Sequence, residues 1–281
     1  MDGPAILVAS MSVPQPRGKT GRRWQYHSRS DLHSKVACWG VCFDLLSQSA
    51  LLQSHVSSGK VIFGVNHEMR DFSTGRKKNL DLVIARPAGS LAKRSPRSLS
   101  DLANDFDIVL DEGQRNRLDA LPTVNEGPVG AVLVALEAKA TMTAHGKARP
   151  RLYDELNSSH LTVHGASSQA LAVGFVMINA SATFVSPDLN KRLRAARVVS
   201  THTQPAAARS VVEKVKEIPR RTGPQSTGFD GLAIVLVSLA NDGGPVTLVE
   251  APPAPQPGDL FFYDNMVTRI ANEYDTTFSS I

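Results

Sequence analysis

Three charged side chains interrupt apolar segments that have the pattern of buried strands. Residues 128–141 are almost continuously apolar until Glu137 and Lys139. Side chains two positions apart in a strand point to the same face, so this carboxylate and this ammonium are predicted to be neighbours. Asp81 interrupts a second apolar run, residues 79–86. Burying such charges costs free energy unless they pair or bind a metal, so we expect either an ion pair at a strand end or metal-assisted chemistry.

The segments around these residues predict the elements that must hold them. Residues 31–56 carry apolar side chains at alternating spacings of four and three, which is typical of an amphipathic helix. The run at 128–141 predicts a central strand that is covered on both faces. The predicted order is helix, three strands, helix and strand, at residues 31–56, 60–66, 79–86, 128–141, 150–163 and 170–180.

This order of elements, together with Asp81, Glu137 and Lys139, resembles the core of the PD-(D/E)XK nuclease superfamily, to which many restriction endonucleases belong. The resemblance covers residues 30–185 and implies an α/β fold with a restriction-endonuclease-like central mixed sheet flanked by helices. The chain departs from the family pattern in two places. Leu80 stands where the motif has proline, and Glu137 follows Asp81 by 56 positions, which requires an insertion at about residues 89–127.

The resemblance implies a metal-dependent endodeoxyribonuclease, most similar to a type II restriction endonuclease. Its catalytic residues would be Asp81, Glu137 and Lys139, and its cofactor would be Mg²⁺. Asp81, Glu137 and the backbone carbonyl of Ala138 would bind the metal, with Glu68 as a further candidate ligand, because hard cations take oxygen ligands. Lys139 would orient the attacking water. The implied partners are double-stranded DNA and a second copy of the chain, since restriction enzymes that cut both strands are commonly homodimers.

Acidic residues elsewhere compete with Asp81 for the metal. The segment DFDIVLDE is strand-like around residues 108–110 and lies closer in sequence to Glu137. Its candidate ligands are Asp105, Asp107, Asp111 and Glu112. In the nuclease family an acid on the first helix sometimes supplies a further metal ligand. The candidates here are Asp31, for which the alternative is a helix cap, and Asp44, for which the alternative is a solvent-exposed position.

Basic residues are spread along the chain, which has a net charge of +5. Residues 1–29 are predicted to be a basic N-terminal arm, and residues 186–281 a C-terminal extension that packs on the core or forms a dimer or DNA contact. Basic groups that flank the proposed site in sequence predict a groove for a polyanion. The candidate DNA-binding residues are Arg76, Lys77, Lys78, Lys147, Arg149 and Arg151.

Composition excludes several classes of protein. The 281 residues, 42% of them hydrophobic, suffice for a sizeable core, and no stretch approaches the roughly 18 to 20 apolar residues of a membrane span. The chain has no GxxxxGK[ST] motif, which argues against an ATP-driven enzyme. Cys38 and Cys42, the only cysteines, are interpreted as buried free thiols in a reducing compartment. We therefore expect a soluble cytoplasmic protein that uses neither a membrane nor ATP.

Three functions of different classes fit these residues. The first is a restriction endonuclease that hydrolyses double-stranded DNA at a specific sequence. The second is a DNA repair or recombination nuclease that recognises DNA structure, and cleavage of plasmid at fixed positions would separate it from the first. The third is a noncatalytic nucleic-acid-binding protein in which Glu137 and Lys139 form only an ion pair.

Overall fold

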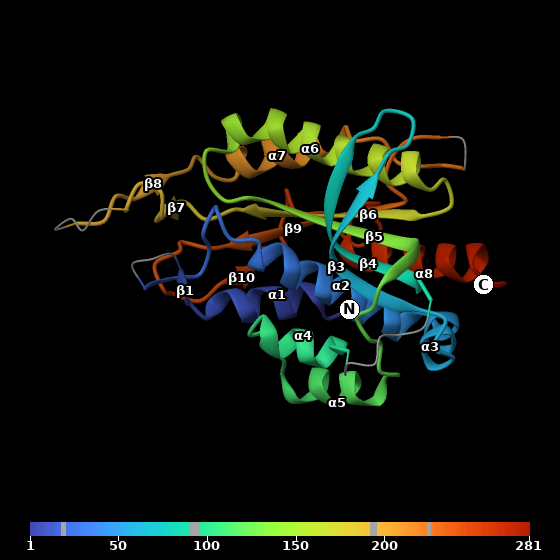
Figure 1. The fold of residues 1–281 in the computed structure, drawn as a ribbon. Helices are drawn as coiled ribbons and strands as arrows, with labels where there is room; N and C mark the ends of the chain where they lie inside the picture. Colours follow the sequence, from blue (N-terminus) through green and yellow to red (C-terminus); the bar gives the residue numbers. More distant parts are fainter. Residues whose placement is uncertain (18–20, 90–95, 192–195, 224–225) are drawn as a thin grey trace.

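A six-stranded mixed sheet forms the centre of the molecule, and helices cover both of its faces (Figure 1). The computed structural model describes residues 1–17, 21–89, 96–191, 196–223 and 226–281. The sheet has the order β10-β9-β6-β5-β4-β3. Its strands are β3 (Ile62–Arg70), β4 (Lys77–Pro87), β5 (Val129–Thr141), β6 (Leu171–Asn179), β9 (Gly231–Ser238) and β10 (Thr247–Leu248). The predicted α/β class is confirmed.

The direction of the strands changes at β5. β3, β4 and β5 pair antiparallel, whereas β5, β6 and β9 run parallel. β5 and β6 are buried over most of their length, as continuous apolar runs predict for strands covered on both faces. The β3–β4 hairpin is longer than predicted, because its strands extend to Arg70 and from Lys77 and leave only residues 71–76 as the turn.

Two hydrophobic cores lie on opposite faces of the sheet. One core contains side chains from α1 (Gly3–Ser12), α2 (Leu32–Gln48), α3 (Ala50–Ser57) and α8 (Tyr263–Thr277). The other contains side chains from α6 (His145–Ala166) and α7 (Ala206–Lys216). The predicted helix at 31–56 is in fact two helices that meet at 98°. The break falls at Ser49, whose side chain accepts a hydrogen bond from the Leu52 amide and so caps the start of α3.

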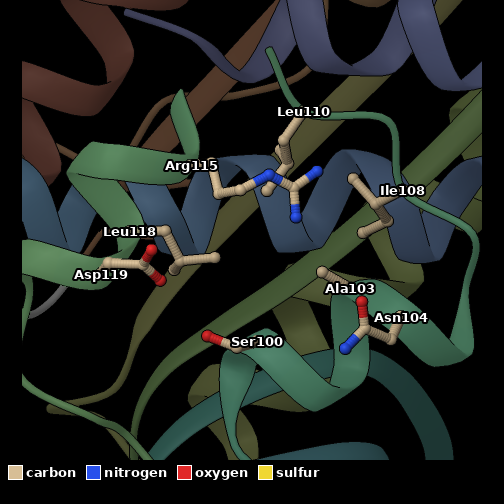
Figure 2. Close-up of a pocket in the computed structure, with 8 residues that line it drawn as sticks. All are labelled: Ser100, Ala103, Asn104, Ile108, Leu110, Arg115, Leu118 and Asp119. Atoms are coloured by element: carbon tan, nitrogen blue, oxygen red, sulfur yellow. The ribbon is translucent and has the colours of Figure 1, made fainter. Parts of the chain in front are cut away.

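The insertion contributes two short helices, α4 (Leu99–Asp105) and α5 (Glu112–Ala120), which lie beside α1 and α2 and away from the sheet (Figure 1). The indole N–H of Trp39 in α2 donates to the Leu99 carbonyl at 2.8 Å. Residues 108–110 lie in the irregular connection between the helices, so the strand expected there is not formed. A hollow of about 260 Å³ lies between α4 and α5, and Asp119 is the only acidic side chain among its lining residues. Figure 2 shows these side chains.

The prediction that residues 1–29 form an arm is wrong for the first half of this segment. Residues 3–12 form α1, in which Ile6 and Leu7 are fully buried. Asp44 of α2 holds this helix, because its carboxylate accepts hydrogen bonds from the Asp2 and Gly3 amides and from the Tyr263 hydroxyl. Asp44 is therefore a buried anchor and neither exposed nor a metal ligand. The other short strands, each paired in its own two-stranded sheet, are β1 (Gln15–Arg17) with β2 (Arg22–Trp24) and β7 (Thr183–Phe184) with β8 (Ser200–Thr201).

Asp44→Ala is expected to lower the free energy of unfolding by about 2–3 kcal/mol, because hydrogen bonds to a buried carboxylate are lost. The measurement is urea denaturation followed by circular dichroism, with Asp154→Ala, an exposed acid of α6, as the control. An unchanged urea midpoint in Asp44→Ala would mean that α1 is not anchored in this way.

The C-terminal extension is part of the same sheet. β9 pairs with β6 from Gly231 to Val237, and α8 buries Met266, Val267 and Ile270 in the core. These side chains are therefore occupied within the chain and do not form a dimer contact. Across the described ranges, no single helix is long and apolar enough to cross a membrane, although α2 and α3 reach that length as a bent pair.

Candidate active site

β4 changes its orientation at Asp81. Leu80 belongs to the core on the α6 side, whereas Leu82, two residues later, belongs to the core on the α2 side. Side chains two apart in a regular strand share a face, so the strand is irregular between them. Opposite Asp81 in the register is Asn66, whose φ of 52° is the left-handed value that marks local irregularity. Asp81 therefore stands at the point where β4 is irregular.

The carboxylate of Asp81 lies where the backbone pairing of β4 with β5 ends. The last ladder pair before this point joins Leu82 to Leu136. Beyond it, the Ala138 amide donates to Oδ2 of Asp81 at 2.9 Å, and the Ser34 hydroxyl of α2 donates to Oδ1 at 3.2 Å. The separation of two central strands thus places an acid between the sheet and the start of a helix.

Glu137 precedes Ala138 on β5 and is almost completely buried, with 3% of its side chain exposed. Its Oε1 lies 2.5 Å from the ammonium of Lys139, as the spacing in the sequence predicts. The same oxygen lies 3.6 Å from the ammonium of Lys78 on β4. Its second oxygen, Oε2, is buried and has no hydrogen-bond partner among the described residues. A buried carboxylate oxygen without a partner is costly, and a cation would satisfy it.

The four charged groups influence each other strongly. Burial, together with the negative charge of Glu137, raises the pKa of Asp81 to about 6. Burial disfavours the charged form of Lys139, but the adjacent Glu137 carboxylate outweighs this effect and the pKa of Lys139 is raised. For Lys78 burial outweighs the attraction of Glu137, so the pKa of Lys78 is lowered.

The oxygen atoms of this site fit a magnesium ion. The amide of Ala138 points to Asp81, and in an extended strand the carbonyl of the same residue points to the same side. Asp81 and the Ala138 carbonyl then face the gap between β4 and β5, and Glu137 immediately precedes Ala138 on β5. Within the described ranges, no three His, Cys, Asp or Glu side chains form a metal-binding group. Mg²⁺ commonly uses one or two carboxylates and keeps several waters, so Asp81, Glu137 and the Ala138 carbonyl are a sufficient set.

The structure does not bring Glu68 to this site as a third acid. Glu68 is on the hairpin, where its carboxylate accepts from the Lys77 ammonium at 2.7 Å, and both side chains are about half exposed. The register pairs Glu68 with Asn79, which moves it along β4 away from Asp81. Glu68 therefore forms an exposed ion pair with a lysine of the neighbouring strand and is not a ligand of the proposed metal.

The competing acids are also committed elsewhere. Asp105 pairs with Arg97 at 2.8 Å, and Asp111 caps the start of α5. Asp107 and Glu112 belong to the same α4–α5 segment, which packs over α2. Asp31 pairs with Lys35 of its own helix at 2.8 Å. The structure therefore brings Asp81, and none of these acids, to Glu137.

Lys78 was predicted to contact DNA, but it does not lie on the surface. Its side chain is 14% exposed, and its ammonium donates to the Glu155 carbonyl of α6 at 2.8 Å, so it faces Glu137 and is not on the surface. The side chains of Arg76 and Lys147 are exposed, and that of Arg149 is half-buried. Arg151 is also exposed, in an ion pair with Glu155.

The sequence did not identify two further residues at the site. Ser34 and Cys38 lie one helical turn apart on α2, and both are buried. Burial raises the pKa of the Cys38 thiol, and the negative charges of Asp81 and Glu137 also raise it. Their spacing of four in the sequence could have indicated that they lie on the same face of the helix.

Comparisons of this chain with models of protein families, with curated proteins and with solved structures gave no match. The residues of the site are therefore the basis for assigning a reaction. They supply two acids at the separation of two strands, one of which has an unsatisfied buried oxygen, and a lysine two residues after the second acid.

Proposed function

We propose that this protein is a Mg²⁺-dependent endonuclease of the PD-(D/E)XK type, which hydrolyses phosphodiester bonds of double-stranded DNA at a specific sequence, as type II restriction enzymes do. The observation that carries the proposal is the position of Asp81 and Glu137, from β4 and β5, where the two strands cease to pair. Lys139 stands beside Glu137 on the same face. The order α2, β3, β4, β5, α6, β6 supports the same family.

Each residue of the site has a separate role in the proposed hydrolysis. Asp81, Glu137 and the Ala138 carbonyl hold the metal, and when bound, Mg²⁺ supplies Lewis acidity at the scissile phosphate. Lys139, whose pKa is raised, stays protonated; it orients the attacking water and offsets the negative charge that develops on the phosphate. The products carry a 5′-phosphate and a 3′-hydroxyl. Cutting of both strands would use a homodimer, with one site for each strand.

The first turns of α6 supply the DNA contacts that the proposal needs. α6 follows β5 directly, so Lys147 and Arg149 come within ten residues of Lys139 along the chain. Lys and Arg side chains at such positions neutralise phosphates and release counterions. Arg76 and Lys77 at the turn of the β3–β4 hairpin extend the basic surface along the strand that carries Asp81.

The double substitution Lys147→Ala and Arg149→Ala is expected to weaken DNA binding and to reduce the slope of log K against log salt concentration by about two. Fluorescence anisotropy of a labelled duplex, titrated at several salt concentrations, measures both. Arg115→Ala, an exposed residue of α5 on the far side of α2, is the control and should leave the slope unchanged. Equal slopes in the double variant and the wild type would place the DNA elsewhere.

Incubation of the purified protein with plasmid DNA, in Mg²⁺ and in EDTA, tests the proposed activity. Discrete fragments that require Mg²⁺ are the expected result. Fragments that depend on nicks, ends or branched substrates would instead identify a structure-specific nuclease. Plasmid that stays intact in every lane while the protein still binds it would contradict the proposal and leave a noncatalytic binding protein.

A further inference from the structure

Two consecutive lysines of β4 have opposite environments. Lys77 is 55% exposed and pairs with Glu68 on the hairpin. Lys78 is 14% exposed and is held between the Glu155 carbonyl of α6, at 2.8 Å, and Oε1 of Glu137, at 3.6 Å. The proposed reaction assigns a role to Lys139 but none to Lys78. A buried lysine costs free energy, so its position beside Glu137 requires an explanation.

The formal charges of the site sum to zero when Lys78 is included. Asp81 and Glu137 contribute two negative charges, and Lys78 and Lys139 contribute two positive charges. A divalent cation gains less attraction from a site without net charge than from a negatively charged one. Without Lys78 the same site would have one net negative charge, and the interaction would be strong at these distances in a partly buried environment.

We propose that Lys78 is an internal counter-charge that competes with the divalent cation for Glu137 and keeps the metal affinity of the DNA-free protein low. Both ammonium groups approach Oε1, while Oε2 has no partner among the described residues. Lys78 therefore acts through Glu137 as a positioning residue, and its loss strengthens metal binding. This inference rests on the proposed function, because it takes the cation site to be the one formed by Asp81 and Glu137.

The test measures Mn²⁺ binding to the DNA-free protein by isothermal titration calorimetry, with electron paramagnetic resonance as a check. Lys78→Met and Lys78→Gln are each expected to bind Mn²⁺ at least tenfold more tightly than the wild type. Lys78→Arg keeps the charge and should bind as the wild type does. Lys77→Met removes an adjacent charge that is exposed and already paired, and it should also match the wild type.

Thermal unfolding shows whether each variant is folded, and Lys78→Gln retains a donor for the Glu155 carbonyl if Lys78→Met is unstable. Equal or weaker Mn²⁺ binding by both neutral variants would overturn the proposal. The plasmid assay on the wild type separates the two claims. Mg²⁺-dependent cleavage combined with unchanged Mn²⁺ affinities would refute the role of Lys78 alone, whereas no cleavage and no Mn²⁺ binding would refute the nuclease assignment as well.

Discussion

Lys139→Ala is expected to reduce DNA cleavage by about a thousandfold while DNA binding and the fold persist, because the removed charge acts on the developing charge of the reaction. Glu137 would still have Lys78 at 3.6 Å, so the buried carboxylate is not left without a counter-ion. Single-turnover cleavage of labelled plasmid measures the rate, and fluorescence anisotropy measures DNA binding.

Two comparisons make the Lys139 result specific. Arg115→Ala, which removes an exposed cation of α5 away from the proposed DNA surface, should cleave at the wild-type rate. Glu137→Ala should also abolish cleavage, but it leaves two partly buried ammonium groups without their carboxylate and should therefore unfold at lower temperature. A Lys139→Ala protein that cleaves like the wild type would reduce Glu137 and Lys139 to a structural ion pair.

Asp81→Asn is expected to lose cleavage and to gain stability at pH 8. The pKa of Asp81 is raised to about 6, so folding favours the protonated form. The favourable contribution of this group is complete below the pKa of the unfolded chain and is lost as the pH rises through about 6. Asparagine stays neutral, so the variant should be more stable than the wild type by about 1–2 kcal/mol at pH 8, after allowance for solvent access, and equal to it near pH 4.

Urea denaturation at pH 4, 6 and 8 measures this difference. Asp71→Asn is an informative control, because hydrogen bonds from Thr74 and Ser73 hold the pKa of Asp71 well below its usual range, so the same substitution there should destabilise the protein near neutral pH. If Asp81→Asn were less stable than the wild type at pH 8, the carboxylate would have a structural role. A carboxylate that lowers stability is retained for another purpose, here the proposed binding of a metal.

The strands and their charged residues could be predicted because the relevant signals are local. The apolar run of β5 is long enough to indicate a buried strand, and alternation alone makes Glu137 and Lys139 neighbours. The inward position of Lys78 could not be predicted, since it depends on the irregularity at Asp81 and on the packing of α6. Only the tertiary structure shows which of two consecutive lysines is buried.

The segments that were misinterpreted lack a periodic signal. α1 is apolar on all sides and contains no amphipathic pattern, and its proline and glycine resemble those of a loop. Pro4 lies in the first turn, where a helix tolerates it. The sequence left open which acid is the first metal ligand of the motif, because Asp81 and the acids at 105–112 all precede β5. The pairing of β4 with β5 shows that Asp81 is the one on the neighbouring strand.

The most direct test of the metal site is a crystal structure with Mn²⁺, using anomalous scattering to locate the ion. The account predicts one peak within about 2.0–2.4 Å of an oxygen from each of Asp81 and Glu137, on the side of the Ala138 carbonyl, with Lys78 displaced from Glu137. A map without a peak at this position, in crystals in which Glu137 still contacts both lysines, would contradict the central claim that these residues form a metal centre.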